Sequence, residues 1–418
     1  MKKINENFCG YIKVEDDTYT YNVSDNIVTL LPAQSDVSKR YDSLYRIKSH
    51  NTDTPEYLFG EDNDSMIAIL HKGKFVTNLI GTNVAIRFAT PIIIKASGNA
   101  QGFFSKLTED WCKFHAITFC GGNINALYTP DIAIEQPDIS ELLKYDGART
   151  IKMRPWSDYT RTTEFQIENE KVTLTVSVGQ TAETNNAENR GAYNLGKMYT
   201  FFRFSFENAQ RFEKIEKYYI IVKKIVAILT AQNNVCFEEV YLSQRNSEQK
   251  YFKTGVCKIF DPYENYSIRQ RHKVIPIFSV FDYIPNLVNG IINSKADSLL
   301  ELLPEDNKMV NRISIKNVQD LCTALEVSYQ LDDKRKREKD ALVEELKKNI
   351  KNTIAEFVKE HNEIDVNKET TISSAFQYLD YTLKQKILTL YNENSDVVNA
   401  IVSREYPKVC VNLQTDVR

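Results

Sequence analysis

The apolar residues of this chain change their spacing near residue 208, and this change constrains the fold more than any other feature. From residue 7 to about residue 207 apolar and polar residues alternate, as in Val172, Leu174 and Val176 with threonines between them. Such alternation is typical of a strand with one buried face. Beyond residue 208 apolar residues recur every three or four positions, the spacing of a helix. The sequence therefore predicts the α+β class, with a β-rich antiparallel N-terminal half and a helical last third.

Turn residues divide the β-rich half into short strands. The segment 83–96, NVAIRFATPIIIKA, predicts two strands separated near Pro91, because proline cannot donate to a sheet ladder. Residues with turn chemistry are Asn26, the group Asp62-Asn63-Asp64 and the pair Gly121-Gly122. The polar segment 181–192 predicts an exposed loop.

A long helix is predicted to begin near residue 208, where Asn208 is placed to cap its first turn. Its apolar stripe consists of Phe212, Ile215, Tyr219, Val222, Val226 and Leu229. Two runs with strand character follow, at 234–243 and 250–260. We therefore expect this helix to pack on a sheet and to close the β-rich half near residue 270.

Four further apolar stripes predict helices in the last third of the chain. They lie at 278–292, 318–329, 342–357 and 376–390. An isolated helix of this length is marginal in water, so a helical bundle is the expected way to bury the stripes. The predicted domains are a β-rich sensor domain at 1–207, a long helix with strands at 208–270, and a helical domain at 271–418.

Composition and charge exclude several classes of protein. Hydrophobic residues at 42% and charged residues at 26% are ordinary for globular chains, and the net charge of −3 gives no overall basic field. Any contact with nucleic acid would need a local basic patch. The seven scattered cysteines predict mostly reduced core thiols. The N-terminus MKKINENFCGYIKV has no apolar stretch long enough for a signal peptide, and Lys223 and Lys224 interrupt the most apolar helix, which is too short to span a membrane. We therefore expect a cytoplasmic protein without a membrane partner.

Motif searches exclude the commonest enzyme classes. The sequence contains no phosphate-binding loop, dinucleotide fingerprint, nucleophile elbow or H-E-x-x-H pair. None of the five histidines pairs with another histidine or a cysteine at helical spacing, so we expect neither a metal nor a cofactor. His115, in the aromatic run WCKFHAITF, is predicted to be a packed core residue.

Two charged features of the helical third have both a plain and a functional interpretation. The basic run at 334–337 is flanked by acidic residues, which favours a solvated helix start over a surface that contacts RNA. Glu326 follows Leu325 on an apolar helix. Its side chain is expected either in solvent or at the edge of a cleft, where it would orient a catalytic group.

Several phrases of the sequence, taken in order, resemble a known family. They are LFGEDNDSMIAIL, FFSKLTEDWCKF, the long helix near 208, VQDLCTALEVSY and SAFQYLDYTLKQKILTLYNE. Together they resemble the ApeA-like proteins of bacterial anti-phage defence, which join an N-terminal β-rich domain to a C-terminal HEPN ribonuclease domain. The resemblance covers most of the chain and implies an abortive-infection effector with a HEPN-like helical bundle.

The defining HEPN motif is an arginine followed by a short polar run and a histidine about one and a half helical turns later. Arg46 and His50 are one residue too close to fit it. The final segment, YPKVCVNLQTDVR, looks like the approach to the motif, so that Arg418 is its arginine and the histidine is expected further along. The resemblance implies that Arg418 and Glu326 are catalytic residues.

The resemblance also implies a reaction and partners. HEPN enzymes resemble metal-independent ribonucleases, in which the RNA 2′-hydroxyl attacks the adjacent phosphate, a histidine moves protons and an arginine stabilises the developing charge. The implied substrate is RNA, with tRNA among the candidates. A phage protein is the implied trigger, and a homodimer through the helical domain is the implied assembly.

Two other interpretations stay open. A chain without a complete HEPN motif fits a non-catalytic sensor or binding protein that dimerises through its helical domain. An enzyme with carboxylates in a cleft of the β-rich half, such as a glycosidase, is a weaker third interpretation, because the carboxylates are too numerous for a pair to be chosen from sequence.

Overall fold

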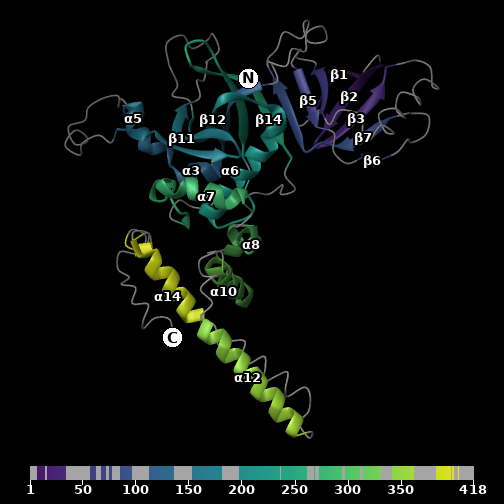
Figure 1. Cartoon of the computed structure of the whole chain (residues 1–418). Coiled ribbons are helices and arrows are strands. Elements are labelled where there is room, and N and C mark those ends of the chain that lie inside the picture. Colours follow the sequence, from purple (N-terminus) through teal and green to yellow (C-terminus); the bar gives the residue numbers. More distant parts are fainter. Residues whose placement is uncertain are drawn as a thin grey trace. The chain divides into compact units, whose positions relative to one another are not determined.

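The computed structural model describes most of the chain (Figure 1). The described residues are 7–14, 17–33, 57–62, 67–71, 75–77, 85–96, 113–135, 153–180, 197–235, 237–260, 268, 273–293, 297–310, 314–330, 341–361, 383–396, 398–399 and 403. The chain divides into two compact units. The first comprises Met1–Val226, Asn234–Arg271 and Asp282–Asn289, and the second comprises Ala227–Asn233, His272–Phe281 and Gly290–Arg418.

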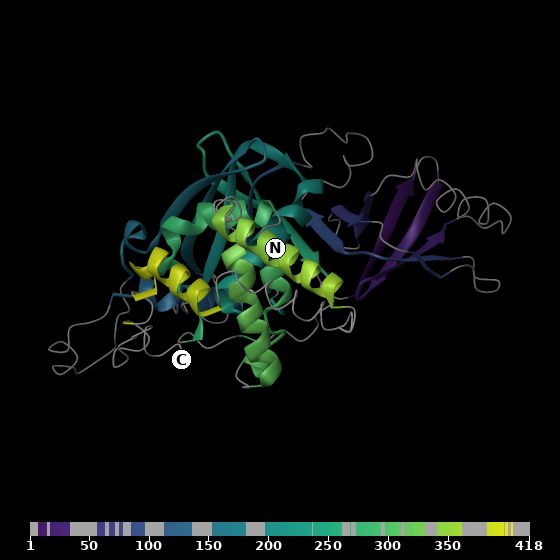
Figure 2. The same cartoon turned by 60° about the horizontal axis from the view of Figure 1, so that its bottom comes forward.

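The first unit is built on a large sheet in which every described strand pair is antiparallel. Its fourteen described strands are β1 (Asn7–Val14), β2 (Asp17–Ser24), β3 (Ile27–Pro32), β4 (Tyr57–Asp62), β5 (Ile67–His71), β6 (Phe75–Thr77), β7 (Ile86–Ala89), β8 (Ile92–Ala96), β9 (Lys113–Cys120), β10 (Arg161–Ile167), β11 (Glu170–Gln180), β12 (Met198–Arg211), β13 (Glu239–Arg245) and β14 (Tyr251–Ile259). Their order in the sheet is β10-β11-β12-β9-β13-β14-β8-β5-β4-β1-β2-β3-β7-β6. The purple strands of the N-terminal segment therefore lie toward one end of the sheet and the teal strands toward the other (Figure 2).

Helices connect or cover these strands and continue into the second unit. They are α3 (Gly122–Leu127), η1 (Pro130–Ala133), α5 (Trp156–Tyr159), η2 (Phe212–Lys214), α6 (Ile215–Thr230), η4 (Ile277–Ser279), η5 (Phe281–Tyr283), α7 (Ile284–Ile292), α8 (Asp297–Glu301), α9 (Asn307–Val310), α10 (Ile315–Gln330), α12 (Ala341–Glu360) and α14 (Leu383–Glu393). The predicted α+β class, with a β-rich antiparallel N-terminal half and helices after it, is confirmed.

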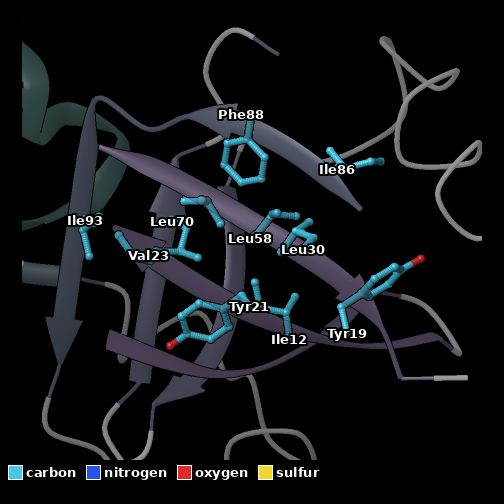
Figure 3. Packing of buried hydrophobic residues seen from close by; sticks show 11 residues of the cluster. Ile12, Tyr19, Tyr21, Val23, Leu30, Leu58, Leu70, Ile86, Phe88 and Ile93 are labelled. Atoms are coloured by element: carbon cyan, nitrogen blue, oxygen red, sulfur yellow. The ribbon is translucent and has the colours of Figure 1, made fainter. Parts of the chain in front are cut away.

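One hydrophobic core lies on the strands of the N-terminal segment (Figure 3). It consists of Ile12, Tyr19, Tyr21, Val23, Val28, Leu30, Leu58, Leu70, Ile86, Phe88 and Ile93. Alternation along β2 and β3 places these side chains on one face, as the period of two predicts. The hairpin between β2 and β3 turns at Asp25 and Asn26, and Asp25 has a positive φ of 53°. The predicted turn at Asn26 and the two strands on either side of Pro91 are confirmed.

A second core lies between α6 and the strands β9 to β12. Phe202, Phe204 and Phe206 alternate along β12 and are buried on the face that meets Tyr218 of α6. The ring centroids of Phe206 and Tyr218 are 4.6 Å apart. Burial of each such aromatic side chain contributes about 1.5–3 kcal/mol. The expectation that this helix packs on a sheet is confirmed.

The predicted start of that helix at residue 208, with Asn208 as its cap, is wrong. Strand β12 continues to Arg211, and α6 begins at Ile215 after the short turn η2. The register between β12 and β9 shifts between Ser205 and Gln210, which is a β-bulge. The bulge lets the strand resume its pairing with β9 at Gln210 and Arg211, so this segment pairs as sheet although its sequence spacing suits a helix.

The predicted helix at 278–292 is interrupted in the structure. Two short turns, η4 and η5, precede α7, which begins at Ile284. Pro285 accounts for this start, because proline fits the first turn of a helix and breaks its interior. The helices predicted at 318–329 and 342–357 correspond to α10 and α12, and the described part of the one at 376–390 belongs to α14.

The division of the chain at residues 207 and 270 stays a prediction. The loop predicted at 181–192 and the basic run at 334–337 lie outside the described residues.

Candidate functional site

Glu326, one of the two catalytic residues that the resemblance implies, lies where α10 meets α14. Its Oε1 atom accepts a hydrogen bond from Nζ of Lys386 at 3.3 Å. The side chain of Lys386 is 16% exposed and that of Glu326 is 45% exposed. The lysine therefore holds the carboxylate while leaving part of it open to solvent, so Glu326 is neither a simple surface charge nor a buried one.

Arg418, the other implied catalytic residue, lies outside the described residues, as do Arg46 and His50. The structure therefore brings no partner to Glu326 besides Lys386 among the residues it describes. Lys386 is 60 positions away in sequence and carries no motif, so sequence reasoning missed it. Only the helix packing reveals the pair.

The apolar stripe of α10 is more exposed than a buried bundle helix requires. Ile315, Val318 and Leu321 recur at three-residue intervals and are all exposed. Leu346 and Phe357 on α12 are exposed as well. The expectation that the helical third buries its predicted stripes is therefore wrong for Val318, Leu321, Leu346 and Phe357, while Ile315 lies outside the predicted stripes.

His115 is part-buried on β9, and its Nδ1 atom accepts a hydrogen bond from the backbone N–H of Arg245 at 3.3 Å. Burial, and then the positive charge of Arg245, lower the pKa of His115. Both effects favour the neutral ring, which is the form whose Nδ1 atom can accept this hydrogen bond. Through this contact His115 joins the hydrogen bonding between β9 and β13, which accounts for its position without a functional role.

Other potential reactive groups have structural surroundings. Cys120 and Cys257 are free and buried, and burial raises the pKa of both thiols, which agrees with the predicted reduced core cysteines. Cys9 is exposed and Cys322 is part-buried. Within the described ranges, no three His, Cys, Asp or Glu residues gather as a metal site. No described helix is long and apolar enough to span a bilayer.

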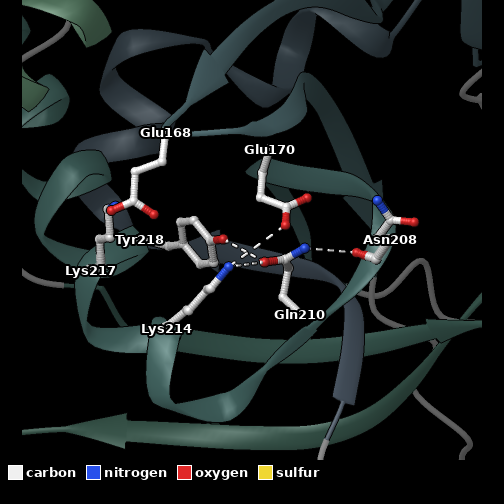
Figure 4. Close-up of polar contacts among 7 residues, drawn as sticks. All are labelled: Glu168, Glu170, Asn208, Gln210, Lys214, Lys217 and Tyr218. Carbon is white, nitrogen blue, oxygen red and sulfur yellow. Dashed lines mark hydrogen bonds and ion pairs between the residues drawn. The ribbon is translucent and has the colours of Figure 1, made fainter.

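A polar cluster joins the end of β12 to the start of α6 (Figure 4). Gln210 is 2% exposed, and its side-chain oxygen accepts hydrogen bonds from Tyr218 at 3.0 Å and from Lys214 at 2.9 Å. Lys214 also lies 3.8 Å from Glu170, and Lys217 pairs with Glu168. Burial, followed by the nearby glutamates, raises the pKa of Tyr218. These contacts anchor the bulged strand to the helix, which accounts for the cluster without a catalytic role.

Comparisons of the chain with protein-family models, with curated proteins and with solved structures found no match.

Proposed function

We propose that this protein is an anti-phage effector whose helical unit cleaves RNA without a metal when infection is sensed. The observation that supports the proposal best is the contact of Glu326 with Lys386 between α10 and α14. It places a half-exposed carboxylate, fixed in position, on the helical unit, which is the arrangement needed to orient a neighbouring catalytic group. The resemblance to ApeA-like proteins implies that this neighbouring group belongs to the HEPN motif, of which Arg418 is the arginine.

In the proposed mechanism each named residue has one task. The guanidinium of Arg418 stabilises the negative charge that develops on the phosphoryl oxygens when the 2′-hydroxyl attacks. Glu326 positions the neighbouring catalytic group, and Lys386 fixes the carboxylate of Glu326. The β-rich unit senses infection, with a phage protein as its trigger, and two helical units pair to form the cleft.

Replacing Arg418 by alanine tests this function. Loss of transition-state charge stabilisation is expected to lower the rate of RNA cleavage by about 100-fold or more. The measurement is cleavage of total bacterial RNA by the purified, activated protein. Lys351→Ala, an exposed change on α12, is the matched control. Cleavage by the Arg418 variant at the control rate would reject the assignment.

Glu326→Gln is expected to lower RNA cleavage by about tenfold, because a neutral amide oxygen accepts a weaker hydrogen bond from Lys386 and does not orient a charged neighbour as a carboxylate does. Glu345→Gln, an exposed change on α12, should leave the rate unchanged. A pH–rate profile distinguishes positioning from folding, since loss of a partner for a titrating group shifts the profile, whereas partial unfolding only scales it. An unshifted profile with an unchanged rate contradicts the role of Glu326.

A sensor that dimerises through its helical unit without cleaving RNA is the second candidate function. The exposed stripe of Ile315, Val318 and Leu321 favours it, because such a stripe is buried when a second copy of the helix packs on it. Light scattering combined with the RNA cleavage assay separates the two functions. Dimers without cleavage by the activated natural protein would favour the sensor, and Leu321→Glu should then yield monomers.

A further inference from the structure

Five side chains of the first unit form a row in which aromatic and cationic groups follow one another: Trp156, Phe201, Arg203, Tyr251 and Arg245. The rings of Trp156 and Phe201 stack with centroids 6.2 Å apart and planes 25° apart. The guanidinium carbon of Arg203 lies 4.7 Å from the ring centroid of Phe201 and 5.3 Å from that of Tyr251. The guanidinium carbon of Arg245 lies 5.9 Å from the same ring centroid of Tyr251. We call these five residues the aromatic–cation row.

The register of the sheet places the row on the face opposite the α6 core. Arg203 pairs with Thr118, whereas Phe202 and Phe204 point to α6, and successive side chains of a strand alternate between faces. On this face the strands between Arg203 and Tyr251 present the small buried side chains of Ala116, Thr118, Cys120 and Ser243. The larger, part-buried Tyr241 lies on the same face, opposite Thr118. The side chain of Arg203 reaches the ring of Tyr251 across β9 and β13.

The charges on this face do not cancel within the described residues. The nearby carboxylates are paired with lysines, Glu239 with Lys253 and Glu238 with Lys197. Arg203 donates from Nε to Oγ1 of Thr118 at 3.4 Å and also hydrogen-bonds the side chain of Tyr241, but it has no carboxylate partner in the part of the chain that the structure describes. A guanidinium that is stacked on aromatic rings but lacks an anion presents its remaining N–H groups to one.

Arg245 adds a second positive charge to the row. Its Nη2 atom donates to the carbonyl oxygens of Phe206 and Glu207, which it holds at the β12 bulge. These acceptors are neutral, so they do not compensate the charge. Burial, and then the positive charge of Arg245, lower the pKa of the neighbouring His115. Trp156, at the far end of the row, is 50% exposed and available for stacking.

We infer that the aromatic–cation row binds single-stranded nucleic acid, with a base stacked on Trp156 and a phosphate held by Arg203. Alternating aromatic and basic groups on a sheet face match the two repeating parts of such a strand, its bases and its phosphates. The whole chain has a net charge of −3, so the attraction must come from a local patch, and two uncompensated guanidinium groups supply one. This inference rests on the first unit alone and does not require that the helical unit cleaves RNA.

The test is fluorescence anisotropy of a labelled 2′-O-methyl RNA of about ten nucleotides with the 418-residue chain. This probe lacks the 2′-hydroxyl nucleophile, so binding is measured whether or not the protein is a ribonuclease. We expect binding that weakens as salt rises from about 50 to about 200 mM. Absence of binding at about 50 mM salt would overturn the inference.

Two variants and one control locate the site. Arg203→Gln is expected to weaken binding about tenfold and to reduce its salt dependence, because one phosphate contact is lost. Trp156→Ala is expected to weaken it about fivefold to tenfold through lost stacking, and its half-exposed position leaves the fold intact. Arg211→Gln removes an exposed arginine of the same strand that pairs with Glu213, and should bind as the unchanged protein does. Equal affinities for all variants would place binding elsewhere and contradict the row.

Competitors identify the chemistry that is recognised. Unlabelled single-stranded RNA and DNA of the same length should displace the probe. The one that displaces it at the lower concentration is the kind of strand that the site prefers. Inorganic phosphate or an acidic peptide that displaces the probe at the same concentration as the oligonucleotide would overturn recognition of bases and leave an anion site only.

Discussion

Replacing Lys95 by methionine is expected to destabilise the β-rich unit by about 3–5 kcal/mol. The Nζ atom of Lys95 on β8 lies 2.6 Å from Oδ2 of Asp62 on β4, and the side chains are 11% and 2% exposed. Methionine fills a similar volume but leaves the Asp62 carboxylate buried without its cation. The same carboxylate lies near the buried hydroxyl of Tyr21, whose pKa is raised by burial and then by Asp62.

Hydrogen exchange of the backbone amides in β4 and β8, followed with urea, measures this loss. Lys171→Met is the matched control, because Lys171 pairs with Glu164 at a similar distance of 2.8 Å but both side chains are exposed. Exposed pairs contribute about 0–1 kcal/mol. The double change Lys95→Met with Asp62→Leu should recover most of the loss, since an apolar pair leaves no unpaired charge. Equal effects of the two lysine changes would refute the burial argument.

Replacing Phe204 by alanine is expected to destabilise the same unit by about 3–5 kcal/mol. The ring of Phe204 is fully buried beneath α6. Its centroid lies 5.6 Å from that of Phe165, 6.2 Å from that of Phe119 and 6.4 Å from that of Tyr218, all in edge-to-face geometry. Alanine would remove these contacts and leave a cavity that the surrounding strands cannot close.

Urea unfolding followed by hydrogen exchange in β9, β11 and β12 reports the change. Phe252→Ala on β14 is the control, because that side chain is 47% exposed and most surface substitutions change stability by less than about 0.5 kcal/mol. If Phe204→Ala were no more destabilising than Phe252→Ala, the result would contradict the tight packing of Phe204 beneath α6.

The sequence predicted the strands of the sheet well because one buried face imposes a period of two. The alternation at Val172, Leu174 and Val176 and the break at Pro91 follow directly from that geometry. The order of the strands did not follow, since β9 pairs with β12 and β13 through contacts far apart in sequence. Local periodicity carries no information about which strands become neighbours.

Three features could not be predicted from the sequence, each for a physical reason. The bulge in β12 extends the strand into residues whose apolar spacing also fits a helix, so the start of α6 was placed too early. The pair of Glu326 and Lys386 depends on how α10 packs against α14. The aromatic–cation row joins four separate elements through strand register, and none of its residues forms a motif in sequence.

RNA integrity in infected bacteria tests the central proposal most directly. Cells carrying the natural gene are challenged with a panel of phages, and total RNA is followed after infection beside cells that carry Arg418→Ala. The proposal predicts that at least one phage provokes RNA fragmentation and growth arrest in cells with the unchanged gene, while RNA stays intact with the variant. Protection from phage with intact RNA, or identical fragmentation in both strains, would contradict it.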